Sequence, residues 1–262
     1  MSSILDPLFR PLLNLISPEP GMGPFFLILL FSFAISLLIT LVYKAVTDQD
    51  LMRSLKAEMK ELQKEMKELR KDPQKMMEVQ KKSMETNMKY MTHSFKPTLI
   101  TLIPIIIIFG WMSSNLAVYP ILENDTFPVT MTVESELIGY NVSIEVPEGI
   151  ELVSSETQKI ESEEVKWLMK GNYGNYNLLF KIGENYYEKD ITISNQFGDY
   201  ADLESKIEDG NVKSIKIGNE KVKPFQSVGF KFPWIGNFGW LGTYILFSII
   251  FSIVIRKALK VA

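Results

Sequence analysis

The stretch PFFLILLFSFAISLLITLV, residues 24–42, decides the fold class of this chain. It carries no charged side chain, and an apolar helix of about 20 residues is long enough to cross the hydrocarbon core of a bilayer. Two further apolar stretches, residues 97–119 and 238–255, have the same character. The sequence therefore predicts an α-helical membrane bundle with three transmembrane helices.

Each apolar stretch carries small polar side chains toward one end. In the first, Ser32, Ser36 and Thr40 recur every four residues and lead to Lys44. Residues four apart share one face of a helix, so they form a polar stripe. The other two stretches have comparable residues near a basic end, which are Lys96, Thr98, Thr101, Ser248, Ser252 and Arg256. If these ends lie on one side of the membrane, the stripes can meet and form a hydrophilic groove. Alternatively, the Ser and Thr residues serve only as packing contacts between helices.

The distribution of charge predicts the topology. Residues 44–96 contain 13 Lys and Arg against 9 Asp and Glu, whereas residues 120–236 contain 11 against 20. Basic loops remain in the cytosol, so we expect the amino terminus outside and the carboxyl terminus inside. The predicted parts are an outer amphipathic segment (1–22), a first transmembrane helix (23–43), a cytosolic helical hairpin (44–96), a second transmembrane helix (97–119), an extracellular β-rich domain (120–236), a third transmembrane helix (237–255) and a cytosolic tail (256–262).

The cytosolic loop has the pattern of a helical hairpin or coiled coil. Its first half places apolar residues at alternating steps of three and four, which are Met52, Leu55, Met59, Leu62, Met66 and Leu69. Asp72 and Pro73 then predict the cap and first position of a second helix. The second helix carries Met77, Met84, Met88 and Met91. Methionine suits surfaces that accept varied apolar partners, and a coiled-coil core is the alternative role for these residues.

The outer segment changes to a period of two. Residues 129–133, 140–146, 176–182 and 189–193 alternate apolar and polar side chains between turn residues, which predicts an antiparallel β-sandwich-like domain. Residues 213–217 and 220–223 flank Gly218 and Asn219 and predict a further hairpin. At the amino terminus, residues 4–16 predict a short amphipathic helix in the outer headgroup region, or else a disordered tail. Four aromatic residues fit an interfacial belt, which are Trp111, Tyr119, Trp234 and Trp240.

The composition gives enzyme chemistry little support. The chain has no cysteine and one histidine, so cysteine nucleophiles, thiolate metal sites and zinc sites built on several histidines are excluded. No glycine-rich phosphate loop and no nucleophile elbow occur. We therefore expect neither an enzyme nor a cofactor.

The order of these parts resembles the archaeal YidC-like proteins of the YidC/Oxa/Alb membrane-insertase superfamily. The resemblance rests on DPLFRPLL (6–13), the first span, the hairpin, the proline-containing second span and FPWIGNFGWLGTY (232–244) leading into the third span. It covers about half of the chain. The outer β-domain departs from the three-span core of this superfamily.

The resemblance implies a membrane protein insertase and chaperone of the plasma membrane. Its relatives pass polar segments of client proteins through a cytosol-open groove without nucleotide, so the ten polar-stripe residues are the candidate client groove. Met77, Met84, Met88 and Met91 are the candidate contacts with clients or the ribosome. The expected partners are the ribosome, nascent membrane proteins and the lipid bilayer, with no small-molecule substrate and no DNA.

Bacterial relatives place an arginine inside the groove, whereas this chain has none within a span, and Lys44, Lys96 and Arg256 match only by their position at the boundary. A membrane receptor or tether, with an outer binding domain and a cytosolic coiled coil, is the alternative function. Such a protein would tolerate replacement of its spans by other apolar helices, whereas an insertase would not.

Overall fold

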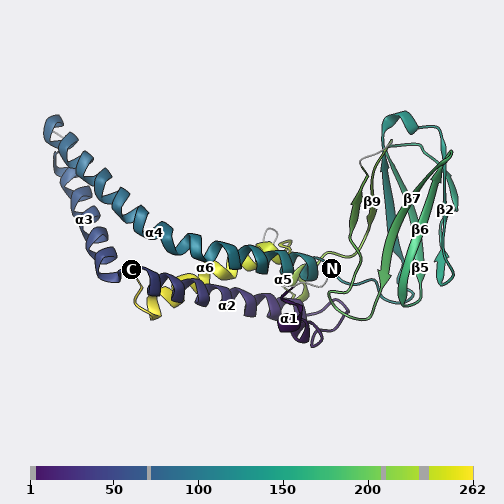
Figure 1. Ribbon diagram of the computed structural model, residues 1–262, viewed down its shortest axis with the longest axis horizontal. Coiled ribbons are helices and arrows are strands. Elements are labelled where there is room, and N and C mark those ends of the chain that lie inside the picture. The colour runs from purple at the N-terminus through teal and green to yellow at the C-terminus, as the bar shows by residue number, and fades with distance from the viewer. Residues whose placement is uncertain (1–3, 70–71, 208–210, 230–235, 262) are drawn as a thin grey trace. The chain divides into compact units, whose positions relative to one another are not determined.

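The computed structural model describes residues 4–69, 72–207, 211–229 and 236–261 (Figure 1). Trp234 and residues 232–235 of the sequence resemblance lie outside these ranges. Contact density divides the chain into two compact units, one of residues 1–26 with 111–240 and one of residues 27–110 with 241–262. The helices are α1 (Asp6–Leu13), α2 (Gly23–Val46), α3 (Gln49–Glu68), α4 (Pro73–Leu116), α5 (Pro224–Ser227) and α6 (Trp240–Ala258). The strands are β1 (Phe127–Val133), β2 (Asn141–Glu145), β3 (Ile150–Leu152), β4 (Thr157–Lys159), β5 (Glu164–Gly171), β6 (Gly174–Ile182), β7 (Asn185–Ile193), β8 (Glu204–Lys206) and β9 (Val212–Ile217), and the 3-10 helix η2 (Ser135–Leu137) lies between β1 and β2.

Three of the helices are long and apolar enough to cross a membrane. Among the described residues these are α2, α4 and α6, which confirms the prediction of three membrane helices. The helix ends differ from the expected boundaries, because α2 continues to Val46 and α6 runs from Trp240 to Ala258.

Helix α4 joins two elements that the sequence separated. It runs without interruption for 44 residues, across the expected boundary between residues 96 and 97 and through Pro97 and Pro104. Proline lacks a backbone donor, but neighbouring helices and Ser or Thr side chains make it tolerable in membrane helices. Around Pro97 the hydroxyl of Thr98 donates to the carbonyl of Ser94, at 3.2 Å. The second arm of the hairpin and the membrane span therefore form one continuous helix.

Helix α3 packs along the amino-terminal half of α4 to form a helical hairpin (Figure 1). The Asp48 carboxylate accepts hydrogen bonds from the backbone N–H groups of Asp50 and Leu51, each at 3.0 Å, and so caps α3. The Lys82 ammonium pairs with the Glu58 carboxylate of α3 at 3.7 Å. Within the predicted seam of α3 the buried side chains are Met52, Leu55 and Leu62. On α4 the less exposed face is formed by Met76, Val79, Ser83, Thr86 and Tyr90.

The predicted start of the second arm is confirmed. Helix α4 begins at Pro73, and the Asp72 carboxylate accepts a hydrogen bond from the backbone N–H of Lys75 at 3.3 Å. Proline is favoured at a first helical position because its missing N–H would have no partner there.

The β-domain is a sandwich of two antiparallel sheets, as the period-two pattern predicts. One sheet has the strand order β3-β5-β1-β9-β8 and the other β4-β2-β6-β7. Alternate side chains of both sheets form one hydrophobic core. The ring of Trp167 from β5 meets that of Phe180 from β6, with centroids 5.3 Å apart, so the two sheets interlock through large aromatic groups.

One predicted hairpin is wrong. Residues 220–223 do not return along β9; instead, Lys221 forms an isolated antiparallel bridge with Val118. The backbone N–H of Tyr119 donates to the carbonyl of Glu220 at 2.8 Å. Gly218 and Asn219 follow the end of β9 without forming a hairpin turn, and the partner of Lys221 is the segment that enters the domain. Because Val118 and Lys221 are about 100 residues apart, no local sequence pattern indicates that they pair.

Helix α1 confirms the amphipathic amino-terminal element. The Asp6 carboxylate accepts a hydrogen bond from the Trp111 indole N–H at 2.8 Å, and the Phe9 ring lies 5.0 Å from the Trp111 ring. Ile4, Leu8 and Leu15 remain exposed. Trp111 is only 2% exposed and Tyr119 only 4%, so the prediction that these two face an interfacial belt is wrong.

A buried lysine connects the two sheets. Lys189 points inward from β7, and its ammonium donates to the backbone carbonyl of Asp202 and to the Ser205 hydroxyl, the latter at 2.8 Å. Because the amine is desolvated, its pKa is lowered from the ordinary value, although nearby carboxylates of Asp202 and Asp190 oppose the shift. The side chain thereby fixes the segment that leads into β8.

The stability of the β-domain should fall at alkaline pH through Tyr200. Burial raises the pKa of Tyr200 to about 12, from an ordinary value near 10. The native state therefore keeps the proton where the unfolded state releases it, and about 2–3 kcal/mol of stability is lost between pH 10 and 12. Denaturant unfolding of the full-length protein at pH 9 and at pH 12, followed by the fluorescence of Trp167 in the sandwich core, should show a smaller loss for Tyr200→Phe. An equal pH dependence in both proteins would contradict this assignment.

Candidate functional site

Helices α2 and α6 approach closely through the hydroxyl stripe of α2. The Ser32 hydroxyl lies 2.7 Å from the carbonyl of Ile28 in its own helix and 3.5 Å from that of Tyr244 in α6. Ser36 donates to the carbonyl of Ser248 at 3.3 Å. Small hydroxyl residues permit such close backbone contact between membrane helices. The stripe on α2 is therefore buried against α6.

Two other hydroxyl groups of these helices donate to carbonyls of their own helix, and a third is half-buried. Thr40 is buried and donates to the carbonyl of Ser36 at 2.7 Å. Ser248 donates to the carbonyl of Ile245 at 2.9 Å, and Ser248 and Ser252 are both half-buried. None of these residues is part of the cavity described next.

A cavity of about 290 Å³ lies between α2, α4 and α6. Helix α4 supplies most of its polar wall, and α6 contributes one guanidinium group. Its lining residues are Ile39 and Tyr43 from α2, Tyr90, Ser94, Pro97, Thr98 and Thr101 from α4, and Arg256 from α6. Three of the predicted groove residues, Thr98, Thr101 and Arg256, thus come together here.

The aromatic ring of Tyr43 holds the cation at this cavity. The Arg256 guanidinium lies over the Tyr43 ring, 4.8 Å from its centroid, in a cation–π contact. The hydroxyls of Tyr90 and Ser94 lie next to that of Tyr43. Thr101 is buried and donates to the carbonyls of Pro97 and Thr98, at 3.1 Å each. The wall can therefore offer hydrogen bonds and one positive charge to a polar guest.

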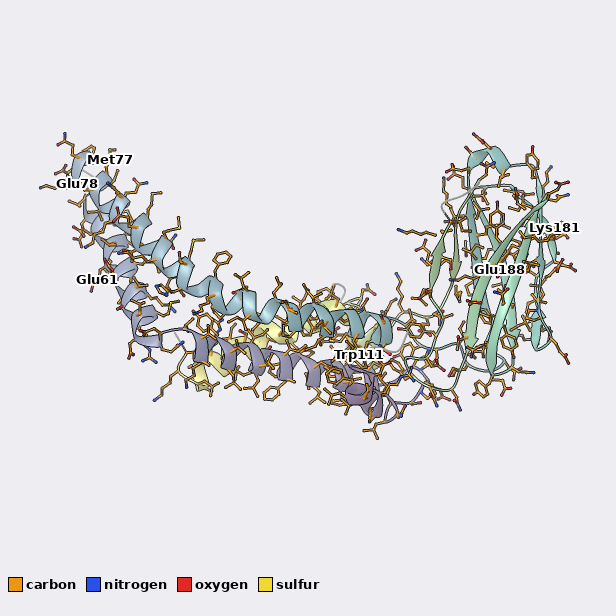
Figure 2. All side chains as sticks on the ribbon, in the orientation of Figure 1. Glu61, Met77, Glu78, Trp111, Lys181 and Glu188 are labelled. Atoms are coloured by element: carbon orange, nitrogen blue, oxygen red, sulfur yellow. The ribbon has the colours of Figure 1, made fainter. Side chains whose placement is uncertain are left out.

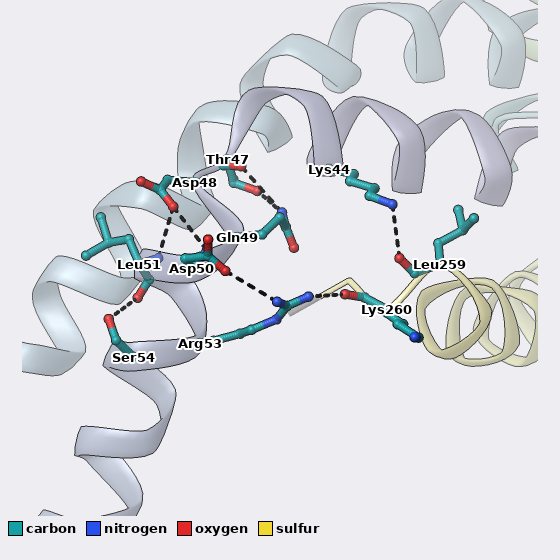
Figure 3. Close-up of polar contacts among 10 residues, drawn as sticks. All are labelled: Lys44, Thr47, Asp48, Gln49, Asp50, Leu51, Arg53, Ser54, Leu259 and Lys260. Atoms are coloured by element: carbon teal, nitrogen blue, oxygen red, sulfur yellow. Dashed lines mark hydrogen bonds and ion pairs between the residues drawn. The ribbon is translucent and has the colours of Figure 1, made fainter.

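The two predicted lysines lie elsewhere. Lys44 is exposed, and its ammonium donates to the carbonyl of Leu259 at 3.1 Å (Figure 3). Lys96 is exposed on α4 and does not line the cavity. Sequence reasoning missed Tyr43, Tyr90 and Ser94. Tyr90 and Ser94 lie on the same face of α4 as Thr98 and Thr101, at helical spacing. The sequence prediction ends the hairpin at residue 96, so it places the two pairs in different elements.

The four α4 methionines that are candidate client contacts are exposed rather than packed against α3. Met77 is 68% exposed and lies near the tip of the hairpin (Figure 2). Met84, Met88 and Met91 are exposed on the same side of the helix. Their role as a coiled-coil core between α3 and α4 is therefore excluded, and an apolar surface faces outward. Among the described residues, no cluster of three or more His, Asp or Glu gathers that could hold a metal ion.

Residues 11–144 match the sequence model of a protein family described as integral membrane protein EMC3/TMCO1-like. The chain belongs to this family. The matched region begins within α1, contains α2, α3 and α4, and ends in β2. No curated protein and no solved structure matches the chain significantly.

The EMC3/TMCO1-like family is part of the Oxa1/YidC/Alb3/TMCO1 insertase-related superfamily. The family is linked to membrane protein insertion and is not an enzyme family. The chain is accordingly a multi-pass membrane protein, and its partners are membrane proteins and the lipid bilayer.

Because the chain lacks cysteine, single substitutions can measure which hydroxyl positions meet water. Thr98 is exposed and lines the cavity, so Thr98→Cys should react with a membrane-impermeant, charged thiol reagent. Ser32→Cys and Thr40→Cys are buried against neighbouring helices and should react at least about tenfold more slowly, because they remain desolvated. Equal rates at all three positions would contradict the division between cavity and packing residues.

Proposed function

We propose that this protein inserts client membrane proteins by passing their polar segments through the cavity between α2, α4 and α6. The observation that carries the proposal is a polar wall within otherwise apolar helices, formed by Thr98, Thr101 and Arg256 together with the tyrosines Tyr43 and Tyr90. Membership in an insertase-related family supports it. Ser32, Ser36, Thr40, Ser248 and Ser252 would act as the frame of this groove by fixing α2 against α6.

The physical task explains why such a wall is useful. Moving an unpaired polar group from water into hydrocarbon costs several kcal/mol. Hydroxyl groups and a guanidinium part-way across the membrane replace some of the lost hydrogen bonds and shorten the apolar path. The client's own apolar span then gains free energy on reaching lipid, so no nucleotide is required.

The exposed side of α4 suits the capture of the client's apolar span. Beyond Met77, Met84, Met88 and Met91, exposed apolar side chains continue at steps of three and four through Phe95, Leu99, Leu102 and Ile106. This track leads from the hairpin tip along the same helix into the membrane span. Methionine at its outer end accommodates clients of different shape. The excess of basic residues in the hairpin favours the ribosome as a further partner.

We place the hairpin and the carboxyl terminus in the cytosol, the β-domain outside the cell, and the protein in the plasma membrane as an archaeal YidC-like insertase. The charge difference between residues 44–96 and 120–236 supports this topology. The hairpin would then meet nascent chains as a cytosolic coiled coil.

Removal of the cavity hydroxyls should impair insertion. The double variant Thr98→Val and Thr101→Val keeps side-chain volume but removes two hydrogen-bonding groups, so insertion of clients with a short polar translocated tail should fall about tenfold. The matched control, Thr92→Val with Ser113→Val, changes exposed positions of α4 outside this cavity and should leave insertion unchanged. Insertion can be measured in proteoliposomes by protease protection of the tail. Normal insertion by the cavity variant would instead favour a receptor or tether.

The topology can be read from single cysteines in intact cells. Ser135→Cys lies exposed in η2 of the β-domain and should be labelled by an impermeant maleimide. Ser54→Cys lies exposed on α3 and should be labelled only after the membrane is opened. The reverse pattern would reject the proposed orientation.

A further inference from the structure

Cations from three separate helices gather around the carboxyl end of α6 (Figure 3). Lys44, near the end of α2, donates to the carbonyl of Leu259 at 3.1 Å. Arg53, in the second turn of α3, donates to the carbonyl of Lys260 at 2.8 Å. Lys260 itself closes the helix, with its backbone in the left-handed region at a φ of 52°. Lys257 precedes it by one turn, so the packing brings Lys44 and Arg53 to a basic tail that is more than 200 residues away in the sequence.

The backbone of the tail explains why these contacts form. The N–H of Lys260 bonds to the carbonyl of Lys257, and the N–H of Val261 bonds to that of Arg256, at 3.3 and 2.9 Å. These bonds end the helix and turn the last carbonyls outward. The partial negative charge at a helix carboxyl end then attracts Lys44 and Arg53.

The contacts orient the cations without neutralising them. A carbonyl is uncharged, and a lysine ammonium has three donors of which Lys44 uses one in the contact shown. Arg53 also bonds to the Asp50 carboxylate at 3.3 Å, and Asp48 caps α3 nearby. Two carboxylates therefore oppose four cations. Lys44, Arg53, Lys257 and Lys260 are all exposed, so the remaining positive charge faces outward.

The position of this basic cluster indicates which kind of anion it binds. Helices α2 and α6 are both candidate membrane spans, and the cluster lies at the carboxyl ends of both. Such a position is at the level of lipid headgroups, where phosphate groups are concentrated and basic residues attract anionic lipids. We infer that Lys44, Arg53, Lys257 and Lys260 form a binding site for the phosphate of an anionic lipid headgroup. The inference does not depend on the insertion activity.

The test uses the full-length protein and phosphatidylglycerol as the probe. Purified protein is equilibrated with equal amounts of phosphatidylglycerol and phosphatidylcholine, and the retained lipids are counted by native mass spectrometry. The triple variant Lys44→Gln, Lys257→Gln and Lys260→Gln should retain about tenfold less phosphatidylglycerol, since each basic residue near the surface contributes to anionic lipid binding. The charge-preserving triple change of the same lysines to arginine should retain it.

A matched control separates this site from general charge. Lys60→Gln, Lys64→Gln and Lys67→Gln remove the same charge from exposed positions of α3 and should leave lipid retention unchanged. An equal loss in both glutamine variants, or no loss in either, would overturn the assignment. Displacement of the lipid by millimolar inorganic phosphate would identify a site for a soluble anion and would also overturn it.

Discussion

The structure depends on the requirement that polar groups within apolar helices find partners inside the protein. In α2 the hydroxyls of Ser32, Ser36 and Thr40 donate to carbonyls of α2 and α6, at distances of 2.7–3.5 Å. No water is present in hydrocarbon to replace these partners. One polar stripe thus serves to seal two helices together. In α4 the hydroxyls of Thr98 and Thr101 also donate to carbonyls of their own helix, but they line a cavity, where their oxygen atoms can accept hydrogen bonds from a guest.

The continuity of α4 connects this cavity with the hairpin. One helix carries exposed methionines at its amino-terminal half and Ser94, Thr98 and Thr101 on its cavity face. At a rise of 1.5 Å per residue such a helix is about 66 Å long. Exposed apolar side chains and cavity-lining hydroxyl groups therefore occur on different faces of the same helix. Under the proposed function, this arrangement would let one short chain hold the apolar and the polar parts of a client separately.

The sequence predicts which helices and strands form better than it predicts which of them pack or pair with one another. Apolar length identifies the three candidate spans, and the alternation of residues 129–133 and 176–182 identifies strands of the sandwich, because both signals are local. The strand β5 was missed although Val165, Trp167 and Met169 alternate there. The bridge between Val118 and Lys221 has no local signal. Likewise, a Ser or Thr hydroxyl can bond to its own helix on any face, so spacing alone could not tell the sealed stripe of α2 from the open face of α4.

We propose that client polar segments pass along the open face of α4 and not along the sealed stripe of α2. Site-specific photocrosslinkers at Thr98 and at Ser36, tested with ribosome-bound nascent membrane proteins, distinguish these two paths. We expect Thr98 to crosslink to the translocated polar segment and Ser36 to crosslink only within the protein, to α6. Crosslinks to the client from Ser36, with none from Thr98, would contradict it.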